Sequence, residues 1–293
     1  MMDQDIFHIE FDNRRYPEAQ FDMLSLQQVF SRAHDHDPRD LHRVGFFMLI
    51  LVTDGQGQHT IDFRTHPFRK GDLLTIREDQ VHRFHDHEAK GWLLLFTPNF
   101  LVSYLEKQEA MKTLTLFNEM LGSPLLHLSK QELADLELLV DQISEEYQGI
   151  KDSYSLGIIR SLLHILISKL YRSKSGRGLM IANRKYLSEF LKLQSLVEQH
   201  CFKTRKVGDY ADWMALSSKT LNHVTRHVLD KSTKTFIDEV TILQVKRLLV
   251  NTRLGIKEIA FQAGFEDPTN FFKFFKKYTQ NTPEEFRGGY GVL

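Results

Sequence analysis

The sequence predicts an α+β protein of two domains, a β-rich N-terminal domain with trailing helices and an all-α C-terminal domain. Short apolar segments separated by glycine turns occupy residues 46 to 96, and helical periodicity begins after Pro98. The length of 293 residues is enough for two separate hydrophobic cores. We expect the first domain to span residues 1–172, a linker to span 173–184, and the second domain to span 185–293.

The β-rich region contains four candidate strands. The first strand is apolar throughout and is followed by the turn sequence Asp54–Gly57, whereas the second alternates between polar and apolar residues. The four segments are Phe46–Val52, His59–Phe63, Leu73–Ile76 and Trp92–Phe96. Closely spaced strands with glycine turns are typical of a sandwich or a small barrel.

Two candidate helices and a linker follow the strands. The second helix covers Leu156–Tyr171, and the segment Arg172–Gly178 is small, polar and basic, as linkers often are. The first helix carries an apolar stripe at steps of three and four, formed by Leu133, Leu136, Val140 and Ile143. This stripe has two possible uses, packing beneath the strands or forming a dimer seam.

The distribution of charge differs between the two parts of the chain. The formal net charge is zero, but the part from Arg184 onward carries 18 basic and 12 acidic residues, a balance of +6. The preceding part has a balance of −6 and holds 11 of the 14 histidines. A basic module joined to an acidic one predicts that only the C-terminal part meets a polyanion.

The composition excludes several classes of protein. With 42% apolar and 26% charged residues, the chain has the composition of a folded globular protein. No apolar run reaches the length of about 18 residues that a membrane span needs, and the N-terminus lacks the pattern of a secretory signal. The single cysteine, Cys201, rules out an internal disulfide and is interpreted as a small buried hydrophobe. We therefore expect a cytoplasmic protein with no membrane partner.

The first helical pair of the C-terminal part runs from about Val207 to Leu229. A short helix is expected to end at the turn Ala215–Ser217, and Ser217 or Ser218 can cap the next helix by accepting from its free N–H groups. The apolar face of that second helix is formed by Leu221, Val224 and Val228. Its outer side then presents Lys219, Thr220, Asn222, His223 and Arg226.

The second helical pair has clearer boundaries. Gly264 suits the positive φ of a helix C-terminus, and Asp267 followed by Pro268 is a start signal for the next helix. An aromatic face follows at helical spacing, formed by Phe271, Phe274, Phe275 and Tyr278. The side chains that point away from this face are Thr269, Asn270, Lys273, Lys276 and Lys277.

Two such pairs predict a DNA-binding module with two helix-turn-helix units. A major groove accepts a helix whose first turns carry hydrogen-bonding side chains, while nearby lysines and arginines neutralise phosphates. A long helix between the units can hold the two outer helices about 34 Å apart, as successive major grooves require. The predicted base readers are Lys219, Asn222, His223, Arg226, Thr269, Asn270 and Lys273. An ordinary packing of amphipathic helices, or a module that binds protein instead of DNA, is the alternative.

Three C-terminal stretches resemble the signature of the AraC family of transcription regulators. These stretches are Ile256–Phe265, Asn270–Lys276 and Thr282–Arg287, within a match from about Tyr186 to Arg287. The resemblance implies a seven-helix domain in which a central helix links the two helix-turn-helix units. It also implies a homodimer that binds double-stranded promoter DNA and contacts RNA polymerase, and it favours an activator over a repressor.

Four residues depart from the usual pattern of this family. Thr225 stands where a phenylalanine normally packs, and Phe272 stands where a polar residue is usual. Asp230 and Gln280 replace glycines that follow helices. Because aspartate tolerates the left-handed conformation better than glutamine does, the second replacement is expected to be the more strained.

The N-terminal part resembles the cupin barrel that many AraC-type regulators carry, which implies a binding site for a small effector. The resemblance rests on His42, Gly55–Gly57, Lys70–Leu74 and Gln80–Phe84. We expect a mostly apolar cavity lined by alternate strand residues, for an aromatic, a fatty acid or a sugar. The expected lining residues are His42, Phe47, Leu49, Leu51, Ile61, Leu74, His82 and Trp92.

A cupin metalloenzyme is the rival interpretation of this half. His82 matches the last metal ligand of a cupin, but Val44 occupies the place of the second histidine. The motifs His34-Asp35-His36 and His85-Asp86-His87 have metal-like spacing but adjoin polar loops. We therefore expect no metal, no cofactor and no catalytic residue. The histidines also leave open a sensor of pH.

Overall fold

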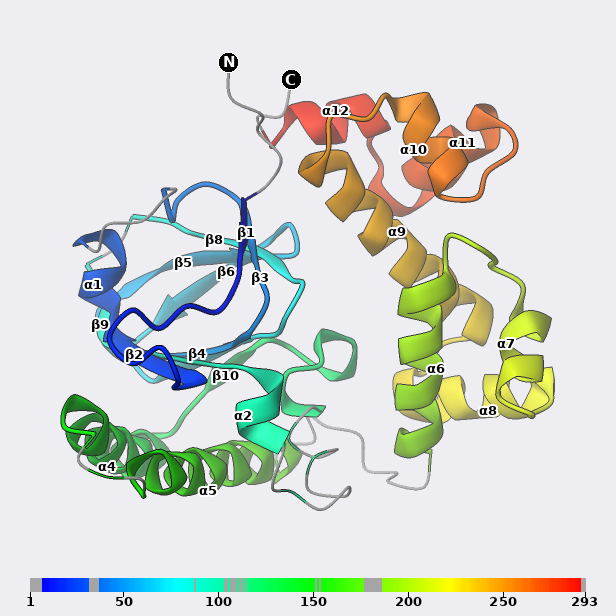
Figure 1. Cartoon of the computed structure of the whole chain (residues 1–293). Helices are drawn as coiled ribbons and strands as arrows, with labels where there is room; N and C mark the ends of the chain where they lie inside the picture. The colour runs from blue at the N-terminus through cyan, green and yellow to red at the C-terminus, as the bar shows by residue number, and fades with distance from the viewer. Residues whose placement is uncertain are drawn as a thin grey trace. The chain divides into compact units, whose positions relative to one another are not determined.

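The structure, a computed structural model, describes residues 7–31, 37–86, 88–102, 105, 110, 113, 115–150, 152, 154–176 and 186–290. Within these residues the chain forms two compact units, 7–176 and 186–290. The first unit is β-rich with trailing helices and the second contains helices only, which confirms the predicted α+β class (Figure 1). Helix α5 continues to Gly176, so residues 173–176 of the predicted linker are helical, and 177–184 lie outside the described residues.

Two five-stranded sheets form the β part of the first unit. The first sheet has the order β1 (Phe7–Ile9), β3 (His42–Val44), β8 (Val81–Phe84), β5 (Gln56–Ile61) and β6 (Arg64–Arg69). The second has the order β10 (Leu125–His127), β7 (Asp72–Ile76), β4 (Phe47–Asp54), β9 (Lys90–Phe96) and β2 (Phe21–Ser25). The pair β1 and β3 is parallel and the other described pairs are antiparallel. The predicted barrel is therefore a pair of sheets that do not close into one.

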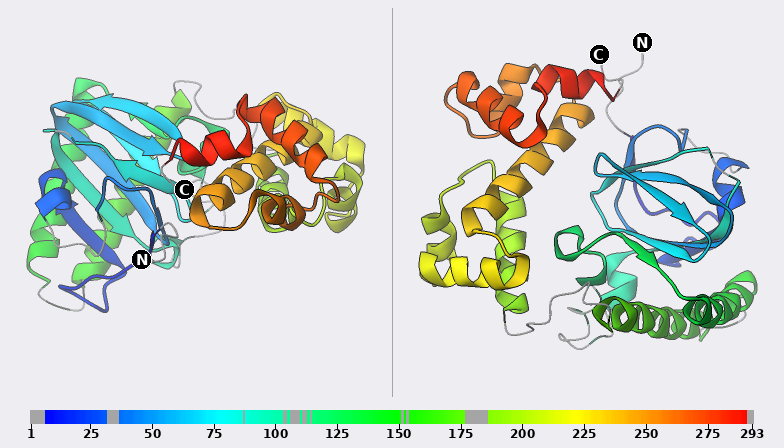
Figure 2. Two further views of the ribbon diagram at one scale, coloured as in Figure 1. Left: turned by 90° about the horizontal axis from the view of Figure 1, so that it is seen from above. Right: turned by 180° about the vertical axis from the view of Figure 1, so that it is seen from behind.

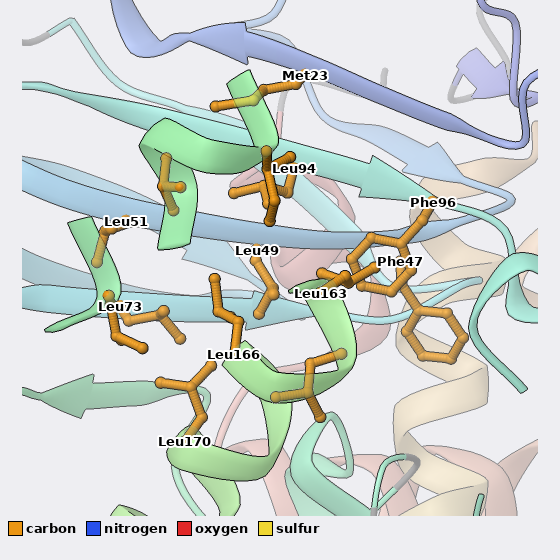
Figure 3. Close-up of a cluster of buried hydrophobic side chains, with 14 of the residues drawn as sticks. Met23, Phe47, Leu49, Leu51, Leu73, Leu94, Phe96, Leu163, Leu166 and Leu170 are labelled. Atoms are coloured by element: carbon orange, nitrogen blue, oxygen red, sulfur yellow. The ribbon is translucent and has the colours of Figure 1, made fainter. Parts of the chain in front are cut away.

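Strand β4 separates two hydrophobic cores because both of its faces are buried. One face contributes Met48, Ile50 and Val52 to a core between the two sheets. The opposite face contributes Phe47, Leu49 and Leu51 to a core beneath the second sheet, against helix α5 (Figure 3). Successive side chains of a strand point to opposite faces, so a strand buried on both sides is apolar at every position.

The outer face of the second sheet is covered by the helices α4 (Lys130–Gln148), α5 (Ser155–Gly176) and α2 (Pro98–Val102). The short helix α1 (Leu26–Ser31) instead buries Leu26 and Val29 in the core between the sheets, and the 3-10 helix η1 spans Glu119–Leu121. Helix α4 begins with a capping box, in which the Ser129 hydroxyl accepts from the N–H of Glu132 and the Glu132 carboxylate accepts from the N–H of Ser129. Its apolar stripe packs into the core beneath the sheet.

Seven helices form the described part of the second unit. They are α6 (Leu187–His200), α7 (Val207–Trp213), α8 (Ser218–Leu229), α9 (Thr233–Asn251), α10 (Ile256–Gln262), α11 (Pro268–Thr279) and α12 (Pro283–Gly288). The long helix α9 lies between the pair α7 and α8 and the pair α10 and α11, as the family resemblance implies (Figure 1). None of the helices that the structure describes has the length and apolar composition that a membrane span needs.

The turns and caps of the second unit explain its helix boundaries. Ser217 caps α8 by accepting from the N–H of Thr220, and Asp267 caps α11 by accepting from the N–H of Thr269. Asp230 and Gln280, which replace family glycines, both have left-handed backbone, with φ of 55° and 63°. Thr225 is fully buried, and its hydroxyl contacts the hydroxyl of Thr233 at 3.0 Å, so a hydrogen bond replaces the expected aromatic packing.

Candidate DNA interface and ligand cavity

Helices α8 and α11 occupy matching places at the two ends of α9. Each packs against α9 and against the short helix that precedes it in the chain (Figures 1 and 2). Helix α9 has 19 residues, and at a rise of 1.5 Å per residue it is about 28 Å long. This length is close to the 34 Å that separates successive major grooves on one side of DNA. A connecting helix of this length can span most of that separation.

The outer side of α8 is exposed at four of the five predicted positions, namely Lys219, Thr220, His223 and Arg226. Asn222 is half-buried, and its carboxamide oxygen accepts a hydrogen bond from the N–H of Thr233 at 3.0 Å. Asn222 thus connects α8 with the start of α9. This contact engages the oxygen that an asparagine uses, together with its amino group, to recognise adenine.

His223 also has a partner within the protein. Its Nε2 lies 3.0 Å from the hydroxyl of Tyr186, and its ring packs 3.9 Å, centre to centre, from that of His227. Tyr186 precedes α6 directly, so a residue far away in the chain orients a predicted base reader. This contact could not be predicted from the sequence because it depends on tertiary packing.

Helix α11 exposes all five predicted residues, which are Thr269, Asn270, Lys273, Lys276 and Lys277. Its buried side is aromatic, with Phe271 and Phe275 fully enclosed. The rings of Phe265 and Phe271 meet at 5.3 Å, which fixes the turn before α11 against the helix itself. Phe272 is half-buried, as expected of a surface aromatic that partly contacts the core. The polar start of the helix therefore faces outward on a rigid support.

The first unit contains a cavity of about 320 Å³ between its N-terminal segment and the sheets. Most of its walls are apolar, and the polar groups at its edge include His42, Asp22 and Arg14. The apolar residues that line it are Phe7, Ile9, Phe11, Leu24, Val29, Val44, Phe46, Met48, Phe84, Leu93 and Leu95. A space of this size and composition suits a small organic ligand.

Most of the predicted cavity residues do not line this space. His42 is the one that does. Phe47, Leu49, Leu51 and Trp92 lie on the other face of the second sheet, in the core with α4 and α5. Side chains alternate along a strand, and a shift by one residue exchanges the two faces completely. Ile61 and Leu74 point between the sheets but are enclosed in the core there.

The N-terminal segment, which was not predicted to contribute, forms one wall of the cavity. Phe7, Ile9 and Phe11 line it, and β1 places them there by pairing with β3. The alternation of apolar and polar residues from Phe7 to Phe11 was the signal that could have predicted a strand with one buried face.

Three buried histidines extend from the cavity into the protein. The ring of His42 lies 4.2 Å, centre to centre, from that of His82, and His82 Nδ1 lies 3.2 Å from His59 Nε2. His59 and His82 are fully buried and do not line the cavity. Among the residues that the structure describes, no group of three or more His, Cys, Asp or Glu is arranged to hold a metal ion.

The two histidine motifs noted in the sequence lie wholly or partly outside the residues that the structure describes. His34-Asp35-His36 and His87 lie outside the described residues. His85 is described, and its Nε2 lies 2.8 Å from the hydroxyl of Thr60. Burial lowers the pKa of His85, and the neighbouring Arg83 lowers it further.

The stripe on α4 packs inside the first unit and does not form an exposed seam. Leu133, Leu136, Val140 and Ile143 are between 0% and 7% exposed and lie in the core beneath the second sheet. The packing alternative is therefore correct for these four residues. The apolar side chains that α4 and α5 do expose, with the residue before α5, are Leu138, Tyr154, Ile158 and Ile165.

Comparison with known proteins assigns both halves of the chain. Residues 25–167 match the family of the AraC-like ligand binding domain, and residues 210–289 match a helix-turn-helix domain family. The HTH-type transcriptional activator RhaR of Escherichia coli (strain K12) is 23% identical over 281 residues, covering 91% of this chain and 94% of RhaR. The RhaR of Mannheimia succiniciproducens is 22% identical over 260 residues, covering 87% and 90%.

Two solved structures are similar to parts or all of this chain. ToxT from Vibrio cholerae O395 is 12% identical, with a TM-score of 0.42, and the match covers 94% of this chain and 99% of ToxT. The C-terminal domain of the response regulator yesN from Fusobacterium nucleatum is 27% identical, with a TM-score of 0.32, covering 34% and 98%. The two family matches and the full-length relatives agree with the two units described above. The chain belongs to the AraC family of transcription regulators, with an AraC-like ligand-binding domain followed by a helix-turn-helix DNA-binding domain.

Proposed function

We propose that the chain binds promoter DNA by inserting α8 and α11 into two successive major grooves. The observation that carries this proposal is the placement of two capped helices with exposed polar starts at the two ends of α9. Each helix is 12 residues long, and each follows a short helix across a turn with left-handed backbone at Ala215 or Gly264. A single site would then consist of two boxes, one for each helix.

The exposed residues divide into two groups by the contacts that their chemistry favours. Lys219, Arg226, Thr269, Asn270 and Lys273 lie on the first turns or the outer side and are proposed to contact base edges. Lys276 and Lys277 lie in the last turn of α11 and are proposed to contact phosphates. Asn222 and His223 have internal partners, so we assign them the additional role of holding α8 in place.

Selection of duplexes from a random DNA library with the full-length chain tests this function. We expect recovered sequences to contain two short boxes whose centres are about one helical turn apart. An enriched single box, or no enrichment over a random pool, would contradict the proposal. Removing the cation of Lys257, which is exposed on α10 and is not assigned to DNA, gives a matched control, since K257A should recover the same sequences.

The cavity of the first unit is the proposed site of a small effector, for which an aromatic, a fatty acid and a sugar were the expected classes. Its apolar lining favours a molecule with a substantial apolar part, and His42 offers one polar contact. In this proposal the ligand shifts the balance between DNA-bound arrangements because it binds one of them better. Screening a library of small molecules for an increase in melting temperature tests it. The variant Met48→Trp should abolish such an increase, and Lys90→Ala, at an exposed position of β9 that does not line the cavity, should preserve it.

A homodimer is proposed on the surface of α4 and α5 in place of the predicted stripe. Ile158 and Ile165 are 44% and 48% exposed and lie seven residues apart, the spacing of paired helices. Leu138 on α4 is 66% exposed and belongs to the same pair of packed helices. Sedimentation of the double variant Ile158→Asp/Ile165→Asp should show a monomer, whereas Phe261→Asp, an equally exposed position in the second unit, should leave the dimer intact. A dimer in both variants would reject this surface.

The remaining parts of the proposal concern transcription itself. The RhaR relatives are named transcriptional activators, and we propose that this chain also activates transcription, through contact with RNA polymerase. We propose no catalytic function and place the chain in the cytoplasm, beside the chromosome. A reporter gene behind a selected two-box site should be expressed more strongly when the chain is present. Lower expression would identify a repressor.

A further inference from the structure

The loop between α6 and α7 crosses from the first helix-turn-helix unit to the second. Arg205 in this loop places its guanidinium 3.7 Å from the ring centre of Phe265 and 5.1 Å from that of Phe274. Both rings belong to the second helix-turn-helix unit. Phe265 lies in the turn before α11, and Phe274 lies in α11 itself. Guanidinium groups are attracted to aromatic faces within about 6 Å, and more strongly when water is excluded. Burial of Arg205 lowers its pKa, as expected for such an environment.

The same loop is also held to the first helix-turn-helix unit, which consists of α7 and α8. The carbonyl of Thr204 accepts a hydrogen bond from the hydroxyl of Tyr210 at 2.8 Å, and the Thr204 hydroxyl donates to Asp209. Asp209 and Tyr210 belong to α7, which packs against α8. Two neighbouring residues of this loop therefore contact different helix-turn-helix units. Thr204 contacts the first of them through α7, and Arg205 contacts the second through Phe265 and Phe274.

Two further contacts make the crossing tight. A side chain on Gly264, whose φ is +77°, would place its Cβ 2.3 Å from the carbonyl oxygen of Phe202. The loop therefore lies directly against the turn between α10 and α11. Lys234 of α9 donates to the carbonyl of Arg205 at 3.3 Å and to the carboxylate of Asp238 at 2.6 Å. Asp238 in turn accepts from the hydroxyl of Tyr278 in α11, at 3.1 Å.

We propose that Arg205 is a positioning residue that fixes the separation and relative orientation of α8 and α11. It therefore determines how many base pairs must lie between the two boxes of a DNA site, an inference that rests on the proposed function. Adding one base pair moves a box by about 3.4 Å and turns it by about 35° around the DNA. A rigid pair of helices follows such a change poorly. A pair that pivots about its separate contacts with α9 follows it more easily.

Binding to duplexes with altered spacing tests the inference. The selected two-box duplex is compared with duplexes that have one base pair more or one fewer between the boxes, by fluorescence anisotropy with the full-length chain. We expect the wild-type chain to lose about tenfold or more in affinity for each changed duplex, and R205A to lose only about twofold. The ratio of two affinities measured on one preparation does not depend on how much of that preparation is folded.

Matched variants separate positioning from charge and from folding. R205K keeps a cation over Phe265 and should restore most of the spacing preference, whereas F274L removes one of the two rings and should weaken it. K257A removes an exposed cation of α10 and should leave the ratio unchanged. If R205A and F274L keep the wild-type ratio of affinities for the selected and the altered spacings, Arg205 does not position the two helix-turn-helix units. The same conclusion follows if both variants lose affinity equally for every spacing.

A measurement without DNA keeps the two proposals distinguishable. Spin labels at His227→Cys in α8 and Lys277→Cys in α11 report the distance between the recognition helices in the free protein. We expect one narrow distance distribution, and a broader one after R205A is added. An unchanged distribution would overturn the inference even if the chain binds DNA, whereas wild-type chain that binds no duplex would overturn the proposed function and its spacing consequence together.

Discussion

Tyr186 and His223 are joined by a hydrogen bond of 3.0 Å between the tyrosine hydroxyl and the imidazole Nε2. The bond connects the residue before α6 with the outer side of α8. Because one ring nitrogen is engaged, only Nδ1 of His223 remains for a base. Removing the hydroxyl in Tyr186→Phe should let the ring rotate and weaken the preference at one base pair by about 1 kcal/mol, the usual worth of a hydrogen bond.

The measurement is the affinity for four duplexes that differ at one position of the first box. Tyr186→Phe should flatten the preference at the position that His223→Ala also affects, and at no other. His200→Ala, which changes a histidine of α6 that packs on Trp213, serves as the control. If both the tyrosine and the histidine variant keep the base preference of the wild-type chain, His223 does not belong to the interface.

Asn270 should determine base preference in the second box. It is exposed in the first turn of α11, where an asparagine can bind an adenine through two hydrogen bonds. Asn270→Ala should reduce discrimination between the selected sequence and its variants by roughly 1–3 kcal/mol, with little effect on binding to random DNA. Competition experiments with both DNA types measure this difference, and an unchanged preference would place Asn270 outside the groove.

Lys276 should contribute to binding regardless of sequence. Its place in the last turn of α11 and its exposed ammonium suit a phosphate contact. Lys276→Ala should weaken binding to selected and random duplexes alike and lower the slope of log affinity against log salt concentration by about 1. An equal slope in the variant and the wild-type chain would show that no counterion release depends on this lysine.

The left-handed residues that end α8 and α11 should differ in how much strain they carry. Glycine adopts this conformation freely, aspartate tolerates it, and glutamine does so at a cost of about 1 kcal/mol. Gln280→Gly should therefore raise the free energy of unfolding by about 1 kcal/mol, and Asp230→Gly by a few tenths. Urea denaturation measures both. A larger gain at Asp230 than at Gln280 would contradict this account.

Lys174 should make the stability of the first unit depend on alkaline pH. Its ammonium is buried, with the carbonyl of Leu116 at 3.3 Å, and burial lowers its pKa to about 8. Between pH 8 and about 10.5 the unfolded chain binds the additional proton, so the free energy of unfolding rises with pH in this range. Below pH 8 the cost of the buried charge is fully present.

Lys174→Met should remove this dependence. The variant should be more stable than the wild-type chain at pH 7, by a gain on the order of 2 kcal/mol, and the gain should disappear near pH 10.5. Melting temperatures across this range measure it. Lys169→Met is the control, because Lys169 is paired with Asp135 at the surface. A gain for Lys174→Met that is independent of pH would show that the pKa of Lys174 is the same in the folded and the unfolded chain, and would contradict this account.

The helical unit could be predicted closely because its signals are local. Ser217 and Asp267 are capping residues at the positions where α8 and α11 begin, and Gly264 marks the turn between α10 and α11. Caps, turns and apolar spacing act within a few residues of each other, so they can be recognised in the sequence. What a capped helix contacts on its outer side is not local, and the partners of Asn222 and His223 were not predicted.

The cavity could not be placed from the sequence because β4 has no polar face. In the run Phe46–Val52 either set of alternate residues satisfies the pattern of a buried face. The stripe on α4 had the same ambiguity, since periodicity shows that a face is buried but not against what. Only the packing of Leu49 against Leu163 and Leu166 distinguishes the faces (Figure 3).

The two helix-turn-helix units follow one another along α9 and carry different side chains on their outer helices. A protomer bound in the proposed way therefore has an upstream and a downstream end, because the box of α8 is not interchangeable with the box of α11. The two orientations of its DNA site are therefore not equivalent. Inverting the site while leaving the promoter unchanged would turn the first helix-turn-helix unit toward the opposite end of the site. The orientation of the site, as well as its sequence, would then decide whether a gene responds.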